Sequence, residues 1–379
     1  MRLVTVRTTL VVLTLITSLA GCGEDPDAGP GPTTVTATTS APESDEPSPE
    51  KQPDAPRVVA EVATGLAVPW GVAFLPDERA VVTERDSRRV VLVDPEGGDP
   101  VVVGEIDEAV PQGEGGLLGV AVSPDFRTDR LLYFYASTET DNRILRAELG
   151  DDDTLGTTEV VFDGIPVGAI HDGGRLAFGP DGFLYASTGE TGIGELSQDL
   201  DSLGGKILRI TSAGAPAPGN PDPDSPVWSY GHRNVQGLAF DDDDNLWARE
   251  FGQSSFDELN LVRPGENYGW PEAEGRSPDE DFVNPRVVWS TGEASPSGLA
   301  YTDGHLWMAA LGGVRLWRVD VADGEAGNPA DFFVGEYGRL RTVVTAPDGM
   351  LWVTTSNRDG RGAPAASDDR ILLVDPGTR

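Results

Sequence analysis

Six stretches of the chain repeat one pattern of apolar and polar positions. Each has a strand-like apolar run, a tight turn rich in Asp, Gly or Pro, and a second apolar run that ends in small or hydroxylated residues. Apolar residues on alternate positions are typical of half-buried strands, and Asp, Gly and Pro adopt the backbone conformations that tight turns require. A third apolar run follows most copies. The six copies occupy residues 71–84, 119–137, 175–190, 237–250, 298–310 and 341–355.

The copies begin about 45 to 60 residues apart, which is the length of one blade of a β-propeller. A blade of about four strands cannot bury both of its faces alone, whereas blades packed radially cover one another. We therefore predict an all-β, six-bladed β-propeller over residues 57–379. The first strand, at Arg57, and the last, at Arg370, are expected to share one blade and close the ring. A β-sandwich or several small β-domains would be the alternative, but neither explains six matched copies.

The first 56 residues have a different composition. Two arginines precede a short apolar run over residues 8–20, which is too short for a stable membrane span and is typical of a secretory signal. Small residues then lead into Cys22, the only cysteine in the sequence, as at a bacterial lipoprotein cleavage site. We predict a lipoprotein signal peptide at 1–21, a lipidated Cys22 and a disordered tether rich in Pro, Thr, Ser and acids at 22–56. The protein would then be exported and anchored to the outer face of the bacterial cytoplasmic membrane, unless the cysteine is incidental to an ordinary signal peptide.

The charge of the chain narrows the choice of partners. Its 379 residues include 63 acidic and 28 basic side chains, a formal charge of −35. So acidic a surface repels nucleic acid and anionic lipid, which leaves the lipid anchor as the only expected membrane contact. Only Lys51 and Lys206 are lysines, so an anion site has to be built from arginines. One cysteine and three histidines provide no zinc signature, and no phosphate-binding loop or nucleophile elbow occurs.

Four segments depart from the repeat, and on a propeller such loops surround the central channel. His171 can accept a proton from an alcohol, although its spacing alone favours an ordinary turn histidine. Arg233 can polarise an oxygen that gains negative charge, or can pair with an acid. Arg339 and Arg341 point to the same side of an extended chain and repel unless an anion, or a neighbouring Asp, lies between them. The irregular segment 250–258, continuing to 267–271, suits calcium, or is a solvated acidic loop.

Four stretches, taken together and in this order, resemble the soluble aldose sugar dehydrogenases of the glucose/sorbosone dehydrogenase group. They are GEGGLLGVAVSPDF at 113–126, HDGGRLAFGPDG at 171–182, YGHRNVQGLAF at 230–240 and DELNLVRPGENYGWP at 257–271. The likeness runs from about residue 60 to the C-terminus. It implies a six-bladed propeller that binds pyrroloquinoline quinone (PQQ) and calcium, in agreement with the blade count from the repeats.

The resemblance also implies roles for individual residues. His171 matches the general base, Arg233 matches the residue that polarises the quinone carbonyl, and Asn234 beside it also contacts the cofactor. Glu114 stands where some members have a glutamine that contacts the sugar or the cofactor. The remaining matches are Arg339 and Arg341 for the cofactor, the backbone carbonyls of Gly252 and Gln253 for a calcium on PQQ, and Glu258 with the Tyr268 carbonyl for a second, structural calcium.

These matches predict an enzyme that oxidises the C1 hydroxyl of an aldose to the lactone. Hydride would pass to PQQ, His171 would take the hydroxyl proton, and an electron acceptor would lie in or near the membrane. One departure is Gly312, which stands where the family often has a lysine on the cofactor carboxylates. A non-catalytic propeller that binds a sugar or a protein is the alternative from another class. A calcium-dependent lactonase is a second enzymatic alternative, but it would need Asp, Asn and Glu around a channel metal rather than arginines.

Overall fold

The computed structural model describes residues 55–377. The predicted signal peptide, the lipidated Cys22 and all but the last two residues of the predicted tether lie outside the described residues. In the described part of the chain, no helix is long and apolar enough to cross a membrane.

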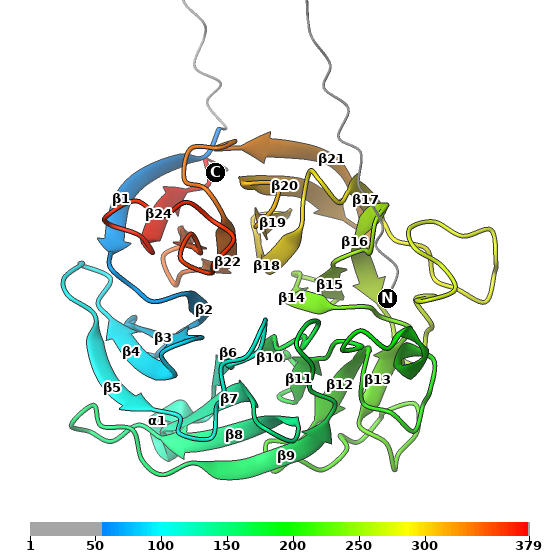
Figure 1. Ribbon diagram of the computed structural model, residues 1–379, viewed down its shortest axis with the longest axis horizontal. Coiled ribbons are helices and arrows are strands. Elements are labelled where there is room, and N and C mark those ends of the chain that lie inside the picture. Colours follow the sequence, from blue (N-terminus) through cyan, green and yellow to red (C-terminus); the bar gives the residue numbers. More distant parts are fainter. Residues whose placement is uncertain (1–54, 378–379) are drawn as a thin grey trace, which may run out of the picture. The chain divides into compact units, whose positions relative to one another are not determined.

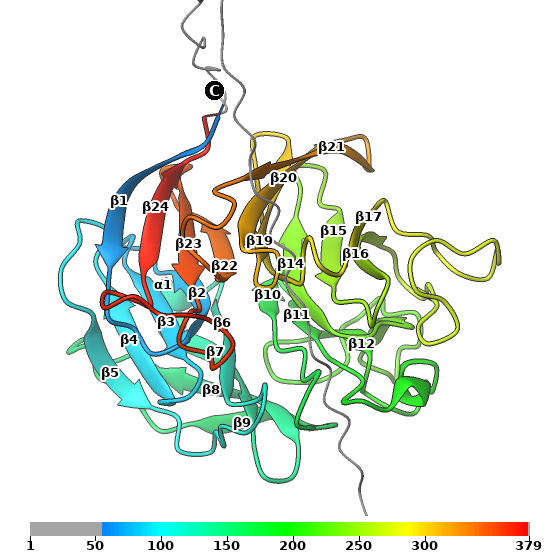
Figure 2. The same cartoon turned by 45° about the horizontal axis from the view of Figure 1, so that its top comes forward.

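Residues 55–377 form the predicted six-bladed β-propeller, with each blade a four-stranded antiparallel sheet set around a central axis (Figure 1). The predicted closure is confirmed, because β1 (Arg57–Ala63) pairs with β24 (Ile371–Asp375) in the last blade. Figure 2 shows these two strands, one from each end of the described chain, side by side. Helix within residues 55–377 is limited to α1 (Phe126–Asp129) and the short 3-10 turn η1 (Gly194–Ser197).

The blades follow one another along the chain and are numbered 1 to 6 in that order. The strands of each blade are given from the innermost to the outermost. Blade 1 contains β2 (Pro69–Phe74), β3 (Ala80–Glu84), β4 (Arg89–Val93) and β5 (Val101–Glu105), and blade 2 contains β6 (Leu117–Val122), β7 (Leu131–Ser137), β8 (Asn142–Glu148) and β9 (Glu159–Ile165). Blade 3 contains β10 (Leu176–Phe178), β11 (Leu184–Ser187), β12 (Lys206–Ile210) and β13 (Val227–Tyr230), and blade 4 contains β14 (Val235–Phe240), β15 (Leu246–Glu250), β16 (Phe256–Val262) and β17 (Val287–Ser290). Blade 5 contains β18 (Pro296–Thr302), β19 (His305–Ala310), β20 (Arg315–Ala322) and β21 (Glu325–Phe332), and blade 6 contains β22 (Leu340–Thr345), β23 (Leu351–Thr355), β24 and β1.

The repeated sequence pattern produces a repeated cross-strand pair between the first and second strands of each blade. In most blades an alanine on the first strand faces a large side chain on the second, which lets neighbouring sheets interdigitate. The pairs are Ala73–Val81, Ala121–Tyr133, Ala177–Tyr185, Ala239–Trp247, Ala300–Trp307 and Val344–Trp352. These large side chains are at most 4 % exposed.

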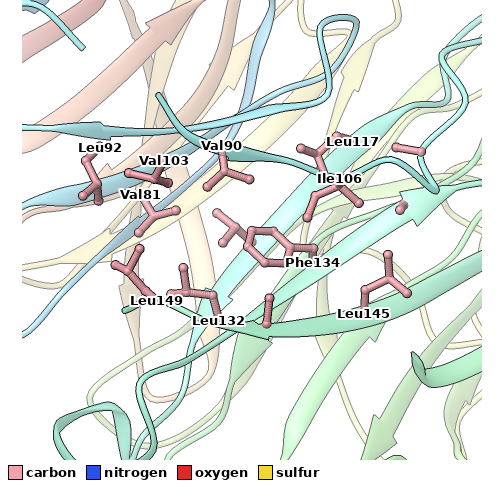
Figure 3. Close-up of a cluster of buried hydrophobic side chains, with 14 of the residues drawn as sticks. Val81, Val90, Leu92, Val103, Ile106, Leu117, Leu132, Phe134, Leu145 and Leu149 are labelled. Carbon is pink, nitrogen blue, oxygen red and sulfur yellow. The ribbon is translucent and has the colours of Figure 1, made fainter. Parts of the chain in front are cut away.

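The hydrophobic core is divided among the six interfaces between neighbouring blades. Each interface has one cluster of buried apolar side chains, and the cluster between blades 1 and 2 is drawn in Figure 3. There, Val81 and Val90 of blade 1 face Leu132 and Phe134 of blade 2, and all four are fully buried. Each such side chain stabilises the fold by roughly 1.5–3 kcal/mol, so the sheets need no other partner than their neighbours.

The antiparallel order of the strands decides which loops meet at the central axis. The start of each first strand lies beside the end of the second strand of the same blade, on one face of the ring. Segments that precede first strands and segments that follow second strands therefore gather at one mouth.

Candidate active site

A cavity of about 320 Å³ lies at this mouth, within the range of small-molecule sites. Most of its lining comes from segments that precede first strands or follow second strands, and Gln236 and Arg341 lie within the first strands β14 and β22. Five guanidinium groups and two carboxylates line it, a surplus of positive charge in a chain of −35. The ionisable lining residues are Arg85, Glu114, His171, Arg233, Arg339, Arg341, Asp359 and Arg361.

His171 lies between β9 and β10 and is paired with a carboxylate. Its Nδ1 is 2.6 Å from Glu190 Oε1, and the two side chains are only 13 % and 3 % exposed. A carboxylate accepts, so we assign the hydrogen to Nδ1, which leaves the lone pair on Nε2. His171 is therefore arranged as a proton acceptor, with Glu190 placed to stabilise the imidazolium that protonation creates.

The backbone around His171 is held in a compact, left-handed turn. The φ angle of His171 is 59°, and the Asn234 side-chain oxygen accepts the N–H of Gly173 at 3.1 Å. A side chain on Gly173 would meet the backbone of Thr188 at 2.5 Å, so this turn requires glycine. Asn234 thus positions the histidine loop in addition to lining the cavity.

Asp172, directly after His171, is a buried carboxyl group held by neutral donors. Its Oδ1 accepts hydrogen bonds from Asn142 Nδ2 and from the N–H of Gly168, both at 3.0 Å. Its Oδ2 and the nearby Ser137 Oγ are buried without a hydrogen-bond partner. Burial raises the pKa of Asp172 to about 6.

Arg233 enters the cavity from the segment before β14. Its Nη1 donates to the Phe251 carbonyl at 3.3 Å, and its guanidinium lies 5.3 Å from the centre of the Trp270 ring. Its Nε is buried without a partner, and burial lowers the pKa of Arg233. No carboxylate among the described residues forms an ion pair with this side chain, so Arg233 keeps its charge available for an anionic ligand.

Arg339 and Arg341 point to the same side of the chain, as predicted, and a single carboxylate lies between them. Asp359 Oδ2 is 2.9 Å from Arg339 Nη2 and 3.6 Å from Arg341 Nη2, and all three side chains are nearly buried. Burial, with repulsion from Arg85, lowers the pKa of Arg341 to about 10. The neighbouring Asp is thus one of the two partners anticipated for this pair. Because one carboxylate faces two guanidinium groups, a positive charge remains.

Glu114 connects the histidine loop to the opposite rim of the cavity. Its Oε2 accepts the backbone N–H of His171 at 3.1 Å, and its Oε1 is 2.9 Å from Arg361 Nη1. Burial alone would raise the pKa of Glu114, but these two donors hold the pKa below its ordinary value. Arg361 lines the same cavity as Gly312, at which the resemblance implies a lysine in many relatives. Arg315, three residues after Gly312, is not among the residues that line this cavity and pairs with Asp331 at 2.7 Å.

A second, very small cavity adjoins the first at the loop between β15 and β16, residues 251–255. Its volume is about 10 Å³, roughly that of one water molecule or ion. Glu250, Glu258 and Glu274 line it, together with Arg233 and Tyr268. Burial, and then the charge of Glu250, raises the pKa of Glu258 to about 8. In the described part of the chain no three acidic, His or Cys side chains are grouped as a complete metal site, so a cation here would also need backbone oxygens.

The structure brings most of the predicted site residues together. The first cavity collects Glu114, His171, Arg233, Asn234, Gly252, Arg339 and Arg341. Gln253 lies next to Gly252 but is exposed, and Glu258 and Tyr268 line the second cavity.

The charged partners of these residues were missed by the sequence analysis. Glu190 and Glu250 end or follow second strands, and that position in the repeat could have indicated them. The missed residues are Arg85, Glu190, Glu250, Glu274, Asp359 and Arg361.

Comparison with known proteins shows which family the chain belongs to. The family model described as glucose/sorbosone dehydrogenase matches residues 66–371. The PQQ-bound form of aldose sugar dehydrogenase from Streptomyces coelicolor is 53 % identical and superposes with a TM-score of 0.83, covering 85 % of this chain and 98 % of that one. The chain belongs to the glucose/sorbosone dehydrogenase family. Aldose sugar dehydrogenase of Escherichia coli K12 is 29 % identical over 77 % of this chain and 88 % of its own length. Quinoprotein glucose dehydrogenase B of Acinetobacter calcoaceticus is 30 % identical over 59 % of this chain and 54 % of its own.

Membership of this family agrees with the resemblance found in the sequence. The propeller, the histidine on one rim and the arginines on the other occur in one chain that matches the family over most of its length. The lactonase alternative is not favoured, because arginines rather than a ring of acids dominate the lining of the first cavity.

Proposed function

We propose that this protein is a PQQ-dependent aldose sugar dehydrogenase that requires calcium. The observation that carries the proposal is the cavity in which an imidazole, oriented by Glu190, faces arginines that exceed the carboxylates in number. The relatives support the proposal, because those named above are sugar dehydrogenases and one of them is bound to PQQ.

The lining of the first cavity fits PQQ, which carries three carboxylates. Arg233 has a buried Nε without a partner, and Arg339 and Arg341 share one carboxylate. These are groups that a polyanionic ligand would satisfy. The carbonyls of Gly252 and Gln253 would hold calcium at the cofactor, since calcium accepts backbone oxygens. Glu258 and the Tyr268 carbonyl would hold a second calcium in the small cavity.

PQQ, when bound, supplies the two-electron acceptor for the hydride from C1 of the sugar. The chain's own task is to remove the hydroxyl proton and to orient the reactants. His171 Nε2 takes the proton from the C1 hydroxyl, and Glu190 stabilises the resulting imidazolium through Nδ1–H. Glu114 holds the His171 backbone in place. Arg233 places a positive charge where negative charge develops. The product is the lactone.

The test is to add PQQ and Ca²⁺ to the purified protein and to follow reduction of a dye with a panel of aldoses. Dye reduction that depends on both additions supports the proposal. Absence of PQQ binding at micromolar concentration would favour the alternative, a non-catalytic propeller that binds a sugar or a protein.

The cellular setting is a separate proposal that rests on the N-terminal sequence. Export, lipidation at Cys22 and an electron acceptor in or near the membrane are consistent with one another, because a tethered domain stays close to a membrane carrier. Metabolic labelling with a radioactive fatty acid tests the anchor, and Cys22→Ala should abolish the label. Label that persists in Cys22→Ala would contradict it.

A further inference from the structure

Four successive backbone N–H groups converge on one carboxylate oxygen at the edge of the site. Glu274 Oε1 accepts the N–H groups of Gln253, Ser254, Ser255 and Phe256 at 2.7, 2.8, 2.8 and 3.2 Å. Hydrogen bonds to a charged acceptor are about twice as strong as neutral ones.

These contacts determine the direction of two carbonyl groups. A trans peptide unit is planar, so its N–H and C=O point in opposite directions. The N–H of Gln253 belongs to the same unit as the Gly252 carbonyl, and the N–H of Ser254 belongs to the same unit as the Gln253 carbonyl. Because both N–H groups are held by Glu274, both carbonyls must point away from Glu274. Gly252 lines the first cavity, and it also lines the small second cavity together with Glu274.

The surrounding contacts reinforce this arrangement. The N–H of Gly252 donates to Asp257 Oδ1 at 2.9 Å, which orients the preceding carbonyl, that of Phe251. That carbonyl accepts from Arg233 Nη1, so it too faces the site. A side chain at Gly252 would collide first with the backbone carbonyl of Phe256 and would also come within 2.7 Å of Glu274 Oε1, so this tight loop requires glycine.

We propose that Glu274 is a positioning residue that aims the Gly252 and Gln253 carbonyls and thereby sets the calcium affinity of the cofactor site. The inference rests on the proposed function, in which these carbonyls hold calcium. Without the carboxylate, the four N–H groups lose their shared acceptor, and the peptide units can rotate away from the orientation that presents two oxygens to one cation.

The experiment compares the full-length wild type with Glu274→Ala, Glu274→Gln and the control Glu272→Ala. Glu272 is exposed and only two residues away, so its removal changes the charge without touching the loop. PQQ binding is followed by tryptophan fluorescence over a series of Ca²⁺ concentrations. Amide hydrogen exchange of residues 253–256 is measured in the absence of Ca²⁺ and PQQ.

We expect Glu274→Ala to raise the Ca²⁺ concentration needed for half-maximal PQQ binding by about 10- to 100-fold, as for other residues that orient metal ligands. Glu272→Ala should change it by less than about two-fold. Glu274→Gln keeps an acceptor oxygen, so the Ca²⁺ concentration that it needs should lie between those of the two alanine variants. If Glu274→Ala does not fold, Glu274→Gln provides the test. Exchange of the four amides should become faster in Glu274→Ala.

The outcomes separate this inference from the proposed function. If wild-type protein binds PQQ with calcium but the Glu274 variants behave like Glu272→Ala, the positioning role is wrong and the dehydrogenase assignment stands. If wild-type protein shows no calcium-dependent binding of PQQ, the proposed function fails. The exchange measurement then still decides whether Glu274 orders the loop, and unchanged exchange would overturn that role.

Discussion

Two sides of the mouth carry unbalanced charge of opposite sign. The arginine side, formed by Arg339, Arg341 and Arg361, has two nearly buried guanidinium groups that share one carboxylate, Asp359. The carboxylate side, formed by Glu250, Glu258 and Glu274 on blade 4 and its loops, has three acids around a small cavity where Arg233 is the only cationic lining residue. Blade 5 lies between them (Figure 1).

The difference shows what each side needs from outside the chain. Buried charge is costly unless it is paired. The arginine side would gain from an anion, and the carboxylate side would gain from a cation. A cofactor with several carboxylates that binds together with calcium satisfies both sides at once, and His171 faces the space where such a ligand would lie.

The largest expected effect comes from the imidazole that faces both sides. His171→Ala should lower kcat by about 10²- to 10⁴-fold, because the substrate hydroxyl loses its proton acceptor. Calcium-dependent PQQ binding should persist, since neither charged side is changed. Steady-state kinetics with dye as acceptor, alongside PQQ titration, measures both. Turnover equal to that of the wild type would remove His171 from its role.

A buried carboxyl outside both sides sharpens the comparison. The pKa of Asp172 is raised from 3.8 to about 6 in the folded protein, so its ionised form is disfavoured there. The stability that the neutral acid provides is complete below about pH 4 and is lost as the pH rises through about 6. The free energy of unfolding of Asp172→Asn should therefore exceed that of the wild type at pH 8 by up to about 3 kcal/mol. This difference in stability should shrink as the pH falls toward 4. Urea unfolding at pH 4, 6 and 8 tests this, and a difference independent of pH would contradict it.

On the carboxylate side, Glu258→Gln should remove most of the stabilisation by calcium. A ligand at a hundred times its Kd stabilises the folded state by about 2.7 kcal/mol, and the variant lacks one charged ligand. Unfolding curves with Ca²⁺ and with a chelator give the difference for each protein. The exposed Glu266 provides the control Glu266→Gln, which should retain the wild-type response. An equal calcium response in both variants would show that Glu258 does not bind the ion.

On the arginine side, the smallest of these effects is expected from Asp359→Asn. Loss of the shared carboxylate should destabilise the protein by about 1.5 kcal/mol, because two nearly buried guanidinium groups then repel each other. Added phosphate should recover more stability in the variant than in the wild type. Thermal unfolding with and without phosphate measures this. Asp348→Asn, on an exposed turn, is the matched control, and an identical phosphate response in the two variants would argue against an anion site here.

The sequence pattern was sufficient for the architecture of residues 57–377. The six copies predicted six blades, and pairing of β1 with β24 confirmed how the ring closes. The alternation of small and large apolar residues carries this information, because each blade packs only against its neighbours and the same local rule applies six times.

The candidate site was predicted only in part. His171, Arg233, Arg339 and Arg341 stood out because they depart from the repeat, and the structure places all four around one cavity. Their carboxylate partners were missed, since Glu190 is 19 residues from His171 and Asp359 is 18 or more from the arginines. Which acid of the 63 in the chain reaches which cation cannot be inferred from spacing.

The amino-acid sequence alone therefore determined the repeat, the ring of blades and the residues that break the repeat, because these follow from local periodicity and turn chemistry. Only the tertiary structure decided the charge balance of the mouth, the pairing of His171 with Glu190 and the direction of the loop carbonyls beside Glu274. Those depend on distances between segments of different blades and loops, which are fixed when the blades pack.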